Sequence, residues 1–140
     1  MKKGVKKTLA WVSAVAILAG TGGTIALADV DTGTFNFTLA ARGSEKEGSS
    51  GVTKTTSGDA TVTASSASGL SDTNTVVTRV RRSSDLKMMT GTATIKKKLK
   101  TYTMSKLSGV TYSTGKSYKL YGQTSSTATK SVTISGNWKP

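Results

Sequence analysis

The feature that most constrains the fold is an alternation of apolar and polar residues in short segments. Residues 34–40 (TFNFTLA) place Phe35 and Phe37 on one face, and residues 131–138 (SVTISGNW) place Trp138 beside aliphatic residues. A repeat of two residues is the pattern of a β-strand with one buried face. Threonine is abundant and favours the same structure, because its branched β-carbon fits the pleat of a strand. The sequence therefore predicts β structure.

Five further segments carry weaker versions of this pattern: 59–64, 75–82, 89–95, 101–104 and 117–122. Polar stretches rich in Gly and Ser are expected to be loops, at 42–51, 65–74 and 123–129. We therefore expect an all-β fold over residues 29–140, a small antiparallel β-sandwich or open barrel of about six or seven strands. The core should hold four aromatic residues, namely Phe35, Phe37, Tyr118 and Trp138.

The alternation slips by one residue near the middle of the chain. Ile95 and Leu99 are odd-numbered apolar residues, whereas Tyr102 and Met104 are even-numbered. One inserted residue shifts the pattern in this way, so we expect a bulge or turn near Lys97.

The N-terminal segment has the three-part layout of a secretory signal peptide. Residues 1–7 (MKKGVKK) are basic, residues 8–19 (TLAWVSAVAILA) are apolar, and Ala26-Leu27-Ala28 forms an A-x-A cleavage site. We therefore expect a helical signal peptide over residues 1–28 and a secreted, extracellular domain beginning at Asp29. The alternative is an uncleaved anchor, although the apolar run is shorter than the roughly 20 residues that span a bilayer. Another alternative is partial disorder of the exported part, since the 35% apolar content includes this segment.

The chain contains no histidine and no cysteine. Histidine-based triads, cysteine nucleophiles and the usual zinc and copper ligand sets are therefore excluded. An exported domain without disulfides is typical of Gram-positive bacteria, and its stability must come from packing and strand pairing. We expect no enzymatic activity, no cofactor and no metal.

Three short motifs resemble catalytic or metal-binding patterns. Ser113-Thr114-Gly115-Lys116 matches the S-x-x-K nucleophile motif, but a β-turn before the next strand is the simpler interpretation. Glu45 and Glu47 are a possible acid/base pair, and we expect them instead in a solvated loop. Residues 29–33 (DVDTG) begin like a calcium loop, but the twelfth position lacks the required glutamate, so we expect a mobile lead-in.

Charge is divided unevenly between the two halves of the exported part. Residues 29–85 carry six basic and seven acidic side chains, and residues 86–140 carry ten lysines and no acid. Such a balance favours attraction to anionic polymers or surfaces, for which the predicted binding residues are Lys96, Lys97, Lys98, Lys100 and Lys119. The alternative is that these lysines serve solubility and protect strand edges. Lysine without interleaved exposed aromatic residues argues against specific nucleic-acid recognition.

The chain resembles small uncharacterised secreted proteins of Gram-positive bacteria, some of them linked to bacteriocin-like loci. The resemblance rests on Ala26-Leu27-Ala28, the Phe35-x-Phe37 strand, residues 118–122 (YKLYG) and the ending at 132–140 (VTISGNWKP). It implies export and an antagonistic function, and it assigns no catalytic residue. We therefore expect a non-enzymatic protein that binds anionic cell-envelope polymers or surfaces. The alternatives are a bacteriocin-like antimicrobial acting on anionic membranes and an envelope hydrolase using Ser113 and Lys116.

Expression in a Gram-positive host tests the predicted cleavage site. The intact mass of protein recovered from the medium should correspond to a chain beginning at Asp29, because signal peptidase cuts after the second alanine of an A-x-A site. An Ala28→Leu variant should be processed poorly and retained with the cells. Full-length protein in the cytosol and none in the medium would contradict export.

Overall fold

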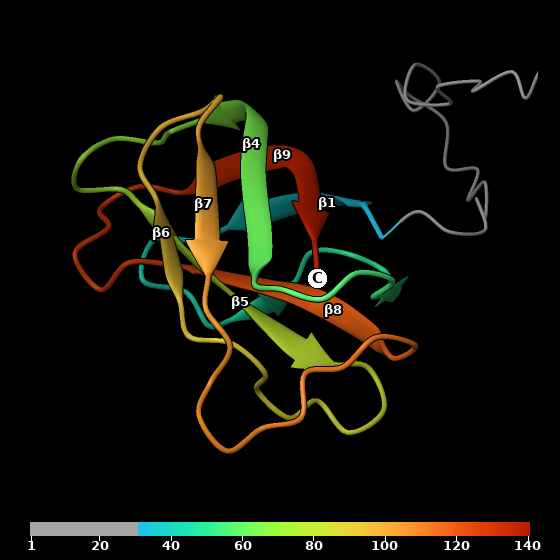
Figure 1. The fold of residues 1–140 in the computed structure, drawn as a ribbon. Coiled ribbons are helices and arrows are strands. Elements are labelled where there is room, and N and C mark those ends of the chain that lie inside the picture. The colour runs from blue at the N-terminus through green and yellow to red at the C-terminus, as the bar shows by residue number, and fades with distance from the viewer. Residues whose placement is uncertain (1–30) are drawn as a thin grey trace, which may run out of the picture.

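The protein is an all-β sandwich of two antiparallel sheets, as predicted (Figure 1). The computed structural model describes residues 31–140, so the predicted signal peptide and Asp29 lie outside the described residues. Within this range there are nine strands rather than six or seven, and no helix. The additional strands are short ones that contribute backbone pairing and little burial.

The first sheet contains four strands in the order β1-β9-β4-β7. Their bounds are β1 (Gly33–Leu39), β4 (Ala60–Ser68), β7 (Thr101–Met104) and β9 (Val132–Lys139). The last strand thus lies between the first and the fourth, and its register with β1 runs from Gly33 opposite Trp138 to Leu39 opposite Val132. Strands from both halves of the chain therefore alternate within one sheet.

The second sheet contains five strands, with β2-β8-β5-β6 in order and β3 also paired with β8. Their bounds are β2 (Lys46–Glu47), β3 (Val52–Thr53), β5 (Val76–Arg82), β6 (Ala93–Ile95) and β8 (Ser117–Thr124). In Figure 1, β4 and β7 run from top to bottom, and β5 and β8 run obliquely to them. The core lies between the two sheets.

The four aromatic residues predicted for the core are all buried, which confirms that prediction. Phe35 and Phe37 lie in contact, with ring centroids 5.5 Å apart. In the opposite sheet Val76 and Val80, on one face of β5, are also buried. The alternation of apolar and polar residues therefore identified the buried faces of β1 and β9 correctly.

Four local predictions were wrong. The expected loop at 42–51 contains β2, and the expected loop at 65–74 begins only after Ser68, because a bulge between Ala64 and Ser66 lets β4 continue along β9. The strand expected at 89–95 is regular only over Ala93–Ile95. Asp31 was expected in a mobile lead-in, yet it is buried because Thr56 and Lys139 bind its carboxylate.

The two sheets approach closely where Phe37 packs against two glycines. A β-carbon added at Gly122 would lie 2.8 Å from the Phe37 ring, and one added at Gly48 would lie closer still. Gly48 also links the sheets through its backbone: its carbonyl accepts the Asn36 N–H and its N–H donates to the Leu120 carbonyl, both at 2.9 Å. The ring and the glycine together set the distance between the sheets at this edge.

A Gly48→Ala variant should lower the free energy of unfolding by about 1–3 kcal/mol, because the new methyl group collides with the Phe37 ring and the packed core cannot move aside. Urea unfolding followed by fluorescence would measure the loss. Gly91→Ala is the matched control, since the nearest atom to its added β-carbon is the Ser105 carbonyl oxygen at 3.7 Å. Equal stability of the two variants would contradict this account of the packing.

Candidate anion-binding site

Charge is distributed very differently over the two outer faces of the sandwich. The outward positions of the four-stranded sheet carry Thr, Ser and Asn along β1, β4 and β7, and Lys139 near the end of β9 is their one charged side chain. The outward positions of the five-stranded sheet carry most of the strand-borne arginine and acid. Only the outer face of the five-stranded sheet therefore carries charged side chains on more than one strand.

Glu45 forms ion pairs with two of the basic side chains on that second face. Its carboxylate binds Arg79 at 2.8 Å and the Nε of Arg81 at 2.9 Å, and its side chain is only 17% exposed. Glu45 was expected in a solvated loop; it lies in the loop before β2, but its ion pairs hold the carboxylate against β5 and shield much of it from water. The two arginines lie side by side on one strand face, so a single carboxylate reaches both.

Lys119, one of the five predicted binding residues, is also paired. Its Nζ lies 3.0 Å from the Glu47 carboxylate, which also accepts the Tyr121 hydroxyl at 3.1 Å. The hydrogen bond that Lys119 donates to Glu47 raises the pKa of Lys119. The other four predicted lysines lie near Thr124, at the end of β8. Lys119 precedes Thr124 by five residues, a distance of roughly 17 Å along an extended strand. The structure does not group it with them.

The other four predicted residues form one exposed turn between β6 and β7. We name residues 96–100 (KKKLK) the lysine turn, which confirms the turn expected near Lys97. The Tyr102 hydroxyl accepts the backbone N–H groups of Lys96 and Lys97, each at 3.1 Å. The N–H of Leu99 donates to the Ala64 carbonyl at 2.7 Å. Three hydrogen bonds thus fix the backbone of the turn to its own strand and to β4.

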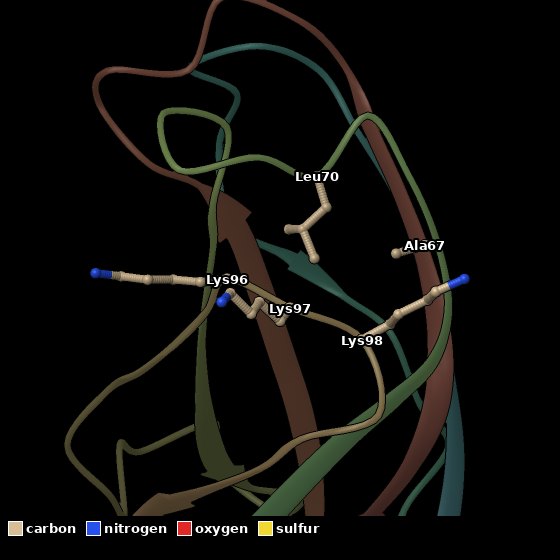
Figure 2. A pocket seen from close by; sticks show the side chains of 5 residues that line it. All are labelled: Ala67, Leu70, Lys96, Lys97 and Lys98. Carbon is tan, nitrogen blue, oxygen red and sulfur yellow. The ribbon is translucent and has the colours of Figure 1, made fainter.

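The lysine turn borders a shallow hollow of about 280 Å³. Figure 2 shows Leu70 pointing into the space above Lys97, while the side chains of Lys96 and Lys98 extend to opposite sides. Lys100 lies over the Tyr102 ring, with its Nζ 5.5 Å from the centroid. Because the ammonium groups diverge, the turn suits an extended anionic surface better than a single phosphate.

None of these four lysines forms an ion pair within residues 31–140. The acidic residues that do form ion pairs bind basic side chains elsewhere, as in Asp31 with Lys139 and Asp85 with Arg82. Lys130 is also exposed, in the loop that precedes β9 at the same end of the sandwich. The lysine turn and Lys130 thus place five lysines without an ion pair at one end of the sandwich, and Lys87, Lys106 and Lys116 are exposed without an ion pair at the opposite end.

Sequence reasoning missed the buried Lys54 and the exposed Leu99. Lys54 is 1% exposed, and its Nζ donates to the carbonyl oxygens of Pro140 and Gly58 at 2.7 and 3.0 Å. Burial lowers its pKa. Leu99 is 74% exposed, which nothing in the local alternation predicted. Lys54 is therefore an interior residue. Leu99 adds an exposed apolar side chain to the lysine turn.

The segment with the S-x-x-K motif forms the expected turn. Thr114 and Gly115 lie at its corner, and Gly115 has a φ of 75°. The Ser113 N–H donates to the Tyr118 hydroxyl at 3.0 Å, and the same hydroxyl donates back to the Ser113 carbonyl. In penicillin-binding enzymes this motif opens a helix, and here the segment leads directly into β8.

A Tyr102→Phe variant should loosen the lysine turn, because Lys96 and Lys97 lose the acceptor of their backbone N–H groups. We expect faster amide hydrogen exchange at these two residues by about fivefold, corresponding to the loss of roughly 1 kcal/mol of local stability. The Val80 amide, bonded to Thr90 in the core, is the internal control and should not change. Unchanged exchange at Lys96 and Lys97 would show that the hydroxyl does not hold the turn.

Within residues 31–140, no three acidic side chains come together as a possible metal site. Over the same range, the structure has no helix with the length and apolar character needed to cross a membrane. No family model, no curated protein and no solved structure was found to match this chain.

Proposed function

We propose that this protein is a secreted, non-enzymatic β-domain that associates with the anionic cell envelope through the lysine turn. The observation that carries the proposal is the pairing pattern. Strand-borne Arg79, Arg81 and Lys119 each form an ion pair with a neighbouring acid, whereas four lysines within one hydrogen-bonded turn of five residues have no acidic partner among the described residues.

The magnitude of the attraction supports this assignment. A lysine close to an anionic surface contributes roughly 1 kcal/mol at physiological salt, so four of them yield an affinity in the range of reversible surface association. The free energy is not reduced by internal competition, since no described carboxylate binds these ammonium groups. Lys119 contributes little to this attraction, because its ammonium group already binds Glu47.

The geometry favours a polyanionic surface over a small anion. The ammonium groups of Lys96 and Lys98 extend to opposite sides of the turn (Figure 2). A single phosphate would need them to converge, and a sheet of phosphate groups does not. Anionic cell-wall polymers and anionic lipid headgroups are the surfaces of this kind that a secreted bacterial protein meets.

Binding of the chain from Asp29 to Pro140 to purified cell walls tests the proposal. This segment contains the whole described core, so it is the form to use. The triple variant Lys96/Lys97/Lys98→Gln should bind about 100-fold more weakly, because three contributions of roughly 1 kcal/mol are lost. Binding of the parent should also fall steeply from about 20 mM to about 150 mM salt, as screening of surface charge requires.

The matched control is Lys87/Lys106/Lys116→Gln, which removes the same charge from exposed lysines at the opposite end of the sandwich. This control should lose less than about tenfold, since its lysines do not border the surface-facing turn. Equal losses in the two triple variants would show that net charge alone governs binding. Salt-independent binding by the parent would exclude the proposed mechanism.

A further inference from the structure

One apolar side chain stands at the tip of the lysine turn. Leu99 is 74% exposed, which makes it by far the most exposed large apolar residue in the described part of the chain. An isolated exposed leucine is ordinary on a protein surface. Leu99 differs because it is surrounded in sequence by four exposed, unpaired lysines.

The backbone of Leu99 also has an unusual conformation. Its φ is 59°, a left-handed conformation that is unusual for a bulky residue and costs free energy. The hydrogen bond from its N–H to Ala64 and the two accepted by Tyr102 hold the turn in this conformation. Three hydrogen bonds therefore stabilise a turn in which an apolar side chain is exposed to water.

We infer that the lysine turn is a membrane-contact element, in which Leu99 enters the interface of an anionic lipid bilayer while the lysines bind the headgroups. This inference rests on the proposed association with an anionic surface and names a lipid bilayer as that surface. An apolar tip with surrounding lysines matches both layers of such a surface, because acyl chains accept the leucine and phosphates accept the ammonium groups.

The hollow beside the turn is consistent with this contact. Leu70 and Ala67 form its apolar part, and the lysine side chains rise from its rim (Figure 2). Long lysine side chains can lie along apolar material while their charged ends remain in water. A soluble polyanion would draw on the lysines alone and would leave Leu99 in water.

Vesicle binding separates the two contributions. The chain from Asp29 to Pro140 is titrated with vesicles of neutral phosphatidylcholine, with vesicles that also contain phosphatidylglycerol, and with lipid-free polyphosphate. Leu99→Asn is the main variant, since asparagine tolerates a positive φ and removes the apolar group. It should bind the anionic vesicles about tenfold more weakly, as expected for losing a buried leucine, and bind polyphosphate like the parent. Lys96/Lys97/Lys98→Gln should lose both ligands.

A Leu99→Trp variant reports insertion directly. Its added tryptophan should be quenched by brominated lipids in anionic vesicles, while buried Trp138 supplies a constant background. Equal vesicle binding by Leu99→Asn and the parent, or no quenching at position 99, would overturn the membrane inference and leave the proposed function standing. Loss of a dimer in Leu99→Asn, with vesicle binding unchanged, would instead assign Leu99 to self-association. Unaltered binding of vesicles and polyphosphate by the lysine variant would overturn the proposed function itself.

Discussion

The close approach of β9 to β4 at Gly136 is the contact on which the rest of the structure depends. A β-carbon at this position would lie 2.9 Å from the Ala64 Cα, so only glycine admits the bulged backbone of β4. The bulge lets β4 continue past the end of its pairing with β7, and there the Ala64 carbonyl receives the N–H of Leu99. Gly136 thus lies opposite the residue of β4 that accepts a hydrogen bond from the lysine turn. Because β9 also lies between β1 and β4, the sheet is complete only when the end of the chain is in place.

The sequence predicted those parts of the fold that arise from burial on alternate residues. Phe35, Phe37 and Trp138 occupy strands whose inward faces were correctly identified, because period two is a direct consequence of the pleat. The alternation slip also located the turn at Lys97. The additional length of β4 was not predictable, because the bulge after Ala64 breaks the period and its small polar residues resemble a loop. Lys46–Glu47 forms a strand through backbone pairing with β8, which has no side-chain signature.

Charge is the property that the sequence described least well. The excess of lysine after residue 86 suggested a cationic half, but strands from both halves alternate in each sheet, so early acids lie beside late bases. Glu47 and Lys119 are an example: they are 72 residues apart and in direct contact. The burial of Lys54 could not be predicted from the sequence either. The carbonyl oxygens that bind its ammonium group come together only in the folded protein. Ion pairs between residues far apart in the sequence therefore determine which basic residues lack an acidic partner, and local composition does not reveal these pairs.

The lysine turn is the place where several ordinary rules of folding are broken together. A bulky residue adopts a positive φ, its apolar side chain faces water, and four like charges lie within five residues without a carboxylate to separate them. Each feature alone lowers stability, and local strain of this kind persists only where surrounding structure determines it. Here the surrounding structure is specific: Tyr102 and Ala64 supply the acceptors that hold the turn. The proposed contact with an anionic bilayer would remove Leu99 from water and reduce the repulsion among the lysines at the same time.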